Sequence, residues 1–352
     1  MMKPGEYIGR FAPSPTGPLH FGSLVAALGS CLEARARGGR WLVRMEDVDL
    51  PRCRPGVDAE ILRALEAFGF AWDGEVLYQG RRGDRYREIL DRLRAGEHVY
   101  PCACTRREMA DSALAVDGAH VYPGTCRAGL APGKAARAWR LRASPDDGPT
   151  PPGLPSRGGD GCSTPRGSGL MTGSALGRPG GGATVCFDDA VQGRLCQDLA
   201  REVGDFVLLR ADGFFAYQLA VVADDADQGV THVVRGADLI DSTPRQIFLQ
   251  QRLGLPTPAY AHLPAAVNAA GEKLSKQAGA APLDPANPAP ALVAALGFLG
   301  QKPPTELARA SAAEIWTWAR ARWDMAGVPR ARTLPAVVAG AVAADADHQP
   351  HG

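Results

Sequence analysis

The sequence lacks a long apolar run, a strong excess of charge of either sign, and an apolar segment near its start. No apolar run in the 352 residues approaches the ~18 residues needed to cross a bilayer, which excludes a membrane-spanning protein. The opening stretch MMKPGEYIGR has no signal-peptide pattern. The formal net charge is +1, so any nucleic-acid-binding surface must be local. We expect a cytoplasmic, monomeric protein of several domains without a membrane partner.

Cysteines are few, and we expect no disulfides among them. The chain has eight, and in a cytosolic protein cysteines serve as metal ligands or buried thiols. Cys186 and Cys196 have no ligand-like spacing. Cys102, Cys104 and Cys126 differ, because C-x-C with a later third cysteine offers three thiolates. Three thiolates are one ligand short of a tetrahedral zinc site.

The stretch 10–23, RFAPSPTGPLHFGS, organises the rest of the chain. A short strand at 7–11 leads into a loop that three prolines keep free of regular structure. A helix opens at Gly22-Ser23, and its apolar residues recur at helical spacing. A loop before a helix N-terminus is an anion site, because free amides and the positive helix end both face it. His20, just before the helix, is placed to donate to a phosphate.

Two arginines and one glutamate predict a site for an amino acid with two carboxylates. Arg10 and Arg235 follow or end predicted strands, and Glu46 follows the strand 41–45. In a parallel sheet the carboxyl ends of strands meet at one crevice. Each arginine offers a bidentate fork for a carboxylate, and Glu46 can pair with an ammonium. Glutamate and aspartate both have these groups, and the residues alone do not say which arginine binds the side-chain carboxylate.

Two separated motifs carry a resemblance to a known family. Pro-Ser-Pro-Thr-Gly followed by Leu-His-Phe-Gly, within 13–22, resembles the first signature of class I aminoacyl-tRNA synthetases of the glutamyl type. The stretch KLSKQ at 273–277 resembles their second signature, a lysine-rich phosphate loop. The residues that these signatures imply for ATP binding are Pro13, Ser14, Gly17, His20, Gly22, Ser23, Lys273, Leu274, Ser275, Lys276 and Gln277.

The resemblance implies activation of a carboxylic acid by ATP with Mg²⁺. The acid attacks the α-phosphorus, pyrophosphate leaves, and the protein positions the reactants and neutralises phosphate charge. His20 and Lys276 are expected to do this, with help from Lys273. The family's amino-acid pocket implies L-glutamate as substrate. The matching residues here are Arg10, Phe11, Ala12, Pro13, Ser14, Glu46, Tyr217 and Arg235.

A narrower resemblance is to the glutamyl-queuosine tRNA(Asp) synthetase family. It depends on PLHFGS, on the Cys-x-Cys and Tyr-x3-Cys pattern, and on the few residues, about 75, that follow Lys276. It implies transfer of glutamate to the queuosine base in the anticodon of tRNA(Asp). The alternatives are an ordinary glutamyl-tRNA synthetase that charges the 3′ end of tRNA(Glu), and a non-catalytic RNA-binding paralogue.

The resemblance also bears on the fourth zinc ligand. It implies Tyr122 beside Cys102, Cys104 and Cys126, with one structural zinc. From the residues alone His120 is the natural fourth ligand, because neutral imidazole binds zinc readily. A phenol ordinarily has a pKa of ~10, so zinc would have to displace the proton of Tyr122.

The expected fold is α/β: a Rossmann-type class I synthetase catalytic domain with an inserted zinc-containing subdomain and a short helical C-terminal region. The expected units are 1–101 and 201–277 for the two catalytic halves, 102–200 for the insertion, 278–338 for the helical region and 339–352 for a disordered tail. Residues 143–184 have 12 Gly and 7 Pro in 42 positions, which is typical of a flexible insertion. A hairpin turn is expected at Asp212-Gly213.

Overall fold

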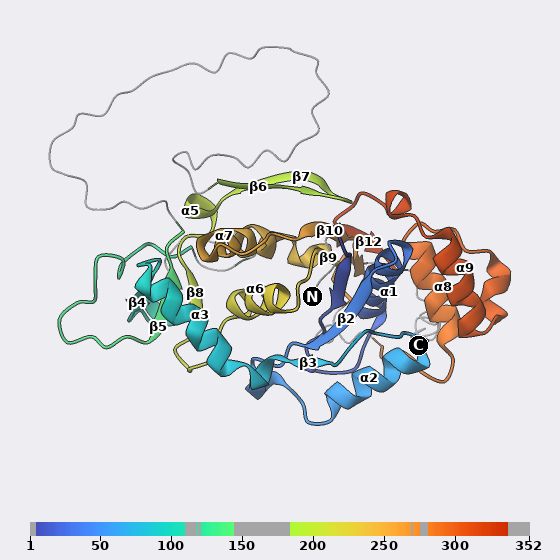
Figure 1. Ribbon diagram of the computed structural model, residues 1–352, viewed down its shortest axis with the longest axis horizontal. Coiled ribbons are helices and arrows are strands. Elements are labelled where there is room, and N and C mark those ends of the chain that lie inside the picture. Colours follow the sequence, from blue (N-terminus) through green and yellow to red (C-terminus); the bar gives the residue numbers. More distant parts are fainter. Residues whose placement is uncertain are drawn as a thin grey trace, which may run out of the picture.

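The computed structural model describes residues 5–109, 118, 121–143, 184–268, 270–274 and 281–336 (Figure 1). The expected insertion at 143–184, apart from its two end residues, and the expected tail at 339–352 lie outside these ranges. None of the described helices is long and apolar enough to span a membrane. The division of the chain into five units stays a prediction.

Two sheets lie edge to edge at the centre of the molecule. In the first, β1, β2 and β3 run parallel, and in the second β9, β10 and β6 run parallel with β7 antiparallel at the edge. The Thr231 amide, just before β9, donates to Ile8 O of β1 at 2.9 Å and connects the two edges. The strand bounds are β1 Ile8–Phe11, β2 Arg40–Met45, β3 Leu77–Tyr78, β6 Thr184–Asp189, β7 Gly193–Asp198, β9 His232–Gly236 and β10 Ala259–Leu263.

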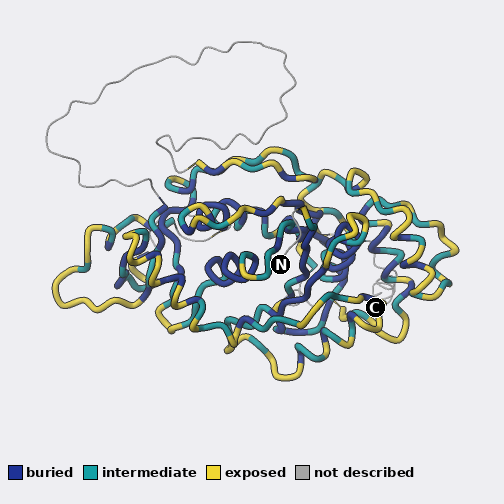
Figure 2. Tube along the Cα trace, viewed as in Figure 1, coloured by how far each residue is buried: buried dark blue, intermediate teal, exposed yellow. Residues whose placement is uncertain are grey.

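Both faces of this sheet are buried, as expected for parallel strands. In β2, Trp41 and Val43 point into the core that contains helix α1, whereas Leu42 points into the core on the opposite face. Figure 2 shows the buried residues concentrated in the central strands and in the helices packed on them. The helix bounds are α1 Phe21–Ala36, α2 Val57–Ala67, α3 Gly83–Ala95, α4 Arg106–Met109, α5 Leu199–Glu202, α6 Tyr217–Asp227, α7 Thr243–Leu253, α8 Pro288–Phe298 and α9 Ala312–Arg322.

Smaller units flank the sheet on both sides (Figure 1). Helix α8 packs on α1 and α9, so the C-terminal helices extend the α1 core. On the opposite side, β4, β5 and β8 form an antiparallel sheet beside a small core that contains Cys102 and Cys126. The remaining strand bounds are β4 Val99–Cys102, β5 Ala138–Leu141, β8 Phe206–Leu209, β11 Ala265–Val267 and β12 Thr333–Pro335.

One expectation is wrong. Cys186 and Cys196 form a disulfide, although we expected none. Their spacing of ten residues carries no metal-ligand signal, but the β6–β7 register places them directly opposite each other across the hairpin. The hairpin turn expected at Asp212-Gly213 is present, and the Arg210 amide donates to Phe214 O across it at 2.9 Å. After a single bridge between Leu209 and Phe215 the chain enters α6, whose apolar residues pack against other helices.

Candidate active site

A cavity of about 430 Å³ opens at the carboxyl ends of β1 and β9. The carboxyl ends of neighbouring strands form such a crevice where the strand order reverses. All the residues expected to bind glutamate line it, namely Arg10, Phe11, Ala12, Pro13, Ser14, Glu46, Tyr217 and Arg235. The structure therefore brings together side chains that are up to 225 positions apart in the sequence.

Most of the residues expected to bind ATP line the same cavity. They are Pro13, Ser14, His20, Gly22, Ser23, Lys273 and Leu274. Gly17 is buried but does not line it. Ser275, Lys276 and Gln277 lie outside the described residues, so the expected role of Lys276 stays a prediction.

The two signature segments meet at the start of α1. His20 is the N-cap residue of this helix, and its extended backbone lets its carbonyl accept from the Leu24 amide at 3.0 Å. A Cβ at Gly22 would lie 3.1 Å from the His20 ring and 3.5 Å from Leu274 O. Beyond the lysine-rich loop, the Leu283 amide donates to Leu19 O at 2.9 Å. Leu274 and Leu283, described residues on either side of the loop, therefore both lie near the N-terminus of α1. A helix N-terminus can bind a phosphate.

Lys273 forms an ion pair in this cavity. Its Nζ lies 2.6 Å from Asp238 Oδ2, and both side chains are partly exposed. Partly exposed pairs of this kind contribute little stability. The pair can therefore open at low cost when a phosphate competes for Lys273.

A buried charge network forms the other end of the cavity. Asp225 Oδ1 accepts from Arg10 Nε at 3.1 Å and from Arg44 Nη2 at 2.7 Å. Arg44 Nη2 also lies 3.6 Å from Glu46 Oε1. Burial raises the pKa of Asp225, but Arg10 and Arg44 outweigh burial and hold it below its usual value. The opposite edge of the Arg10 fork, Nη1 and Nη2, has no hydrogen-bond partner among the described residues.

Glu46 differs from Asp225 in its protonation. Burial raises its pKa from the usual 4.5 to about 7, while Arg44 and Arg10 oppose this only in part. Its Oε1 is buried without a hydrogen-bond donor in the described part of the chain. A carboxylate in this position is prepared for a cationic partner such as an ammonium group.

Arg235 departs from the expected bidentate fork. Its Nε donates to His262 Nε2 at 3.1 Å, and its Nη2 donates to Thr243 Oγ1 at 2.7 Å and to Gln246 Oε1 at 2.8 Å. Its Nη1 lies 3.4 Å from the Tyr217 hydroxyl, a neighbour on the cavity wall. Because any bidentate edge of this guanidinium includes Nη2, Arg235 offers a carboxylate a single nitrogen, Nη1.

The residues that hold these arginines were not expected from the sequence. Asp225 and Arg44 support Arg10, and Asp189, His262 and Thr243 support Arg235. A signal existed for two of them. Arg44 interrupts the apolar strand WLVRM, and Asp225 follows the apolar residues of α6, where an unpaired charge would be costly.

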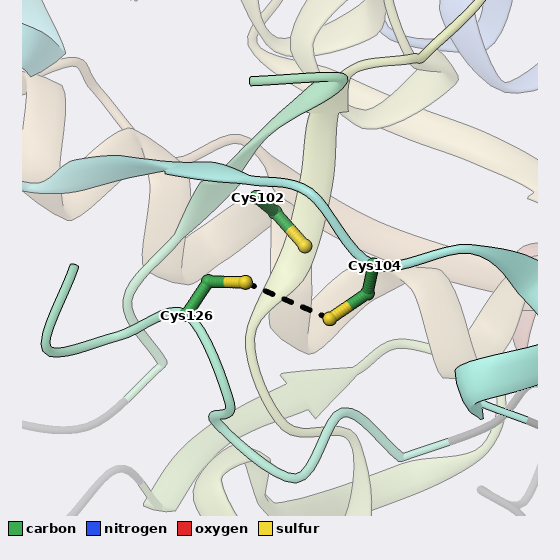
Figure 3. A group of neighbouring side chains, drawn as sticks. All are labelled: Cys102, Cys104 and Cys126. Carbon is green, nitrogen blue, oxygen red and sulfur yellow. Dashed lines mark hydrogen bonds between the residues drawn. The ribbon is translucent and has the colours of Figure 1, made fainter. Parts of the chain in front are cut away.

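The three cysteines expected as metal ligands form a cluster away from this cavity. Their sulfur atoms all lie within 4.8 Å of one another, and Figure 3 shows Cys102 and Cys104 on one segment facing Cys126 on another. The Tyr122 hydroxyl lies 3.5 Å from Cys102 Sγ and 3.6 Å from Cys104 Sγ, and it accepts from the Cys126 amide at 2.8 Å. The structure thus places Tyr122 among the sulfurs, while His120 lies outside the described residues.

The surroundings of the cysteine cluster lower the pKa of Cys126 but raise the pKa values of Cys104 and Tyr122. Arg140 Nε donates to Cys102 Sγ at 3.3 Å, and its guanidinium lies 3.9 Å from the centre of the Tyr122 ring. Burial raises the pKa of Cys126, but hydrogen bonds with the Tyr122 hydroxyl and the Ala103 amide outweigh burial and lower it to about 7. Burial also raises the pKa of Tyr122, so a bound cation would have to displace the phenol proton.

Comparison with known proteins first defines the class. Residues 8–120 and 179–287, more than half of the chain, match the family described as tRNA synthetases class I (E and Q), catalytic domain. A glutamate-tRNA synthetase structure from Elizabethkingia anophelis is 23% identical with a TM-score of 0.69, and the match covers 93% of this chain and 67% of that one. A glutamate tRNA ligase from Elizabethkingia meningosepticum is 22% identical with a TM-score of 0.70, covering 94% and 67%. At these identities the likeness shows the fold, which is that of glutamyl-type class I synthetases.

Relatives with higher sequence identity show which family within this class the chain belongs to. The glutamyl-Q tRNA(Asp) synthetase of Aromatoleum aromaticum is 55% identical over 344 residues, which cover 98% of this chain and 96% of the relative. The proteins of that name from Dechloromonas aromatica and Thiobacillus denitrificans are 55% and 52% identical over 326 and 328 residues, covering 92% and 93% of this chain and 96% and 97% of the relatives. The chain belongs to the family of glutamyl-Q tRNA(Asp) synthetases, which confirms the resemblance seen in the sequence.

Proposed function

We propose that this chain activates L-glutamate with ATP and transfers the glutamyl group to the queuosine base in the anticodon of tRNA(Asp). The observation that carries the proposal is one cavity with two ends. Its arginine-rich end contains Arg10, Glu46 and Arg235, and its other end lies at the start of α1. One end suits an anionic amino acid, and the other suits a phosphate chain. The acceptor is the one in the name of the family, and we propose a cytoplasmic protein that works as a monomer.

The charges of the arginine-rich end favour glutamate. Three guanidiniums, from Arg10, Arg44 and Arg235, lie around two carboxyl groups, from Asp225 and Glu46. The surplus is one positive charge or more, and glutamate has one net negative charge near neutral pH. In this proposal Arg10 binds one carboxylate through its open edge and Arg235 binds the other through Nη1. Glu46 then pairs with the ammonium, and Phe11, Ala12, Pro13, Ser14 and Tyr217 complete the wall.

The phosphate end supports in-line attack without a protein nucleophile. A glutamate carboxylate oxygen bonds to the α-phosphorus of ATP, and the bond to the bridging oxygen of pyrophosphate breaks. His20 and the N-terminal amides of α1 bind phosphate oxygens, while Lys273 and Lys276 neutralise charge as it develops. Mg²⁺ arrives with ATP and offsets phosphate charge. Gly17, Ser275 and Gln277 belong to the same proposed ATP set as parts of the two signature loops.

The cysteine cluster fits a structural zinc ion bound by Cys102, Cys104, Cys126 and Tyr122. Zinc bonds of about 2.3 Å to sulfur and about 2.0 Å to oxygen place tetrahedral sulfurs about 3.8 Å apart and oxygen about 3.5 Å from sulfur. The Cys104–Cys126 sulfur distance of 3.6 Å and the oxygen–sulfur distances of 3.5 and 3.6 Å are close to these values. With four protein ligands the ion would have no open position, so its part would be structural.

Two measurements test the proposed function. Pyrophosphate exchange with each amino acid in turn should depend on glutamate and on no other. Labelled glutamate should then transfer to tRNA(Asp) that contains queuosine, and the label should survive oxidation of the 3′ ribose under conditions that spare queuosine.

The control acceptors separate this function from its alternative. Transcripts of tRNA(Asp) with unmodified guanosine, and tRNA(Glu), should accept no glutamate. Acceptance by either RNA would favour an ordinary glutamyl-tRNA synthetase. Absence of exchange with any amino acid would favour a non-catalytic RNA-binding protein.

A further inference from the structure

The three shortest hydrogen bonds of Arg235 go to side chains that do not line the cavity. His262, Thr243 and Gln246 accept three of its hydrogen bonds, and each of the three is at most 2% exposed. The cavity wall contains Arg235 and Tyr217 but none of these three partners. The orientation of Arg235 is therefore decided from behind the site, on β10 and α7.

His262 is itself fixed by a buried carboxylate. Its Nδ1 lies 2.6 Å from Asp189 Oδ2, at the last residue of β6. Asp189 Oδ1 accepts from the amides of Val191, Gln192 and His262 at 3.0, 2.8 and 3.1 Å. The turn of the β6–β7 hairpin thus wraps around this carboxylate and holds it rigidly.

These contacts specify one tautomer of His262. A carboxylate only accepts hydrogen bonds, so the proton is on Nδ1. A guanidinium only donates, so Nε2 must present its lone pair to Arg235. Burial lowers the pKa of His262 to about 4 despite the hydrogen bond with Asp189, which agrees with a neutral ring.

We propose that Asp189 and His262 are positioning residues for the substrate amino acid. Asp189 selects the His262 tautomer, His262 holds Nε of Arg235, and Arg235 is thereby left to present Nη1 to a substrate carboxylate. The inference rests on the proposed function and deepens it, because it assigns the orientation of one glutamate contact to a pair of residues that never touch glutamate.

A matched pair of substitutions at His262 tests the acceptor role. In His262→Gln the side-chain oxygen can take the place of Nε2 and accept from Arg235. In His262→Asn the amide can take the place of Nδ1 and still donate to Asp189, but the acceptor is lost. In glutamate-dependent pyrophosphate exchange, His262→Asn should raise KM for glutamate about 10- to 100-fold, as expected for a lost buried bond to a charged donor. His262→Gln should raise it several-fold less, and KM for ATP should change in neither.

Asp189→Asn tests whether His262 must have its proton on Nδ1. Its oxygen can still accept from the hairpin amides, while its NH₂ donates to Nδ1 and forces the ring proton onto Nε2, against the guanidinium. KM for glutamate should rise about as much as in His262→Asn, with a melting temperature close to that of the unsubstituted protein. Tyr260→Phe is the control, because it removes a buried hydroxyl from the same strand and keeps the ring.

The outcomes separate this inference from the proposed function. Equal KM values in His262→Gln and His262→Asn, or KM changes that follow melting temperature as in Tyr260→Phe, would overturn the positioning role. An unsubstituted protein without glutamate-dependent exchange would overturn the proposed function and this inference together.

Discussion

The arginine-rich end of the cavity and the cysteine cluster are both built from buried polar side chains, but they are assembled in different ways. The first collects residues from β1, β2, α6 and β9. The second takes its side chains from the short range 102–126. The first contains its own counter-charges, because Asp225 lies between Arg10 and Arg44. The cysteine cluster consists of three thiols and a phenol, and its cationic neighbour is Arg140.

The geometry of the arginine-rich end is therefore expected to depend on the fold, and that of the cysteine cluster on a ligand. In the arginine-rich end, Asp225 forms ion pairs with both Arg10 and Arg44 in the absence of substrate, so its geometry should survive in the empty protein. In the proposed zinc site, the cysteine cluster would gain its full set of bonds only from a cation. Substitutions and metal removal should therefore affect the two regions separately.

The largest effect should come from the lysine-rich loop. In the proposed ATP site Lys276 acts on phosphate oxygens as charge develops, so Lys276→Ala should lower the exchange rate by about two orders of magnitude or more. Stability should hardly change. Lys302→Ala, an exposed lysine in a loop beyond α8, is the matched control and should keep full activity. Exchange that survives substitution of both His20 and Lys276 by alanine would contradict the proposed ATP site.

Asp225 should be the most sensitive residue for folding. Asp225→Asn leaves Arg10 and Arg44 buried without their shared carboxylate, and breaking a buried pair costs about 3–5 kcal/mol. Asp227→Asn is its matched control on the same helix, because Asp227 is partly exposed and pairs with Arg82 and Arg85 near the surface. Denaturant unfolding should show a large loss for the first and about 1 kcal/mol or less for the second. Similar losses of stability in both variants would mean that the buried ion pairs of Asp225 contribute no more to stability than the partly exposed pairs of Asp227.

Metal analysis should show whether the cysteine cluster binds zinc independently of the arginine-rich end. Purified protein should contain about one zinc ion per chain, and Cys104→Ser should lose it. Tyr122→Phe should lower zinc content, whereas His120→Ala should keep it. The reverse result would move the fourth ligand to His120. In each variant KM for glutamate should stay close to that of the unsubstituted protein, because the arginine-rich end contains no cysteine ligand.

The smallest effect should be a pH dependence of glutamate binding. Glu46 binds a proton below its pKa of about 7 in the empty site, and contact with an ammonium requires the carboxylate. Binding below pH 7 must therefore release a proton, so the apparent Kd should rise by up to about tenfold per pH unit as the pH falls. Above that pH it should be flat. Calorimetry in buffers of different ionisation enthalpy checks the proton release, and Glu46→Gln should bind weakly with no such slope.

Local patterns predicted much of the fold and of the site. The strand ending at Phe11, the helix from Phe21 and the strand ending at Met45 were predicted within one residue or two, because apolar periodicity and proline punctuation act over short range. The lining residues followed from two signatures and from the rule that strand ends share a crevice. The turn at Asp212-Gly213 was predicted as well, whereas the helix α6 that follows it was not, because α6 packs against α3 and α7, which are distant in the sequence.

The sequence by itself determined which side chains gather at the cavity, since motif order and strand ends depend on neighbours in the chain. Only the tertiary structure decided how those side chains are held. Three sets of contacts join residues from different elements. They are the disulfide between Cys186 and Cys196, the ion pairs of Asp225 with two arginines, and the hydrogen bonds that connect Asp189 through His262 to Arg235. Hydrogen bonds and ion pairs act over about 3 Å, and contacts of that precision between distant segments exist only once the strands have their register.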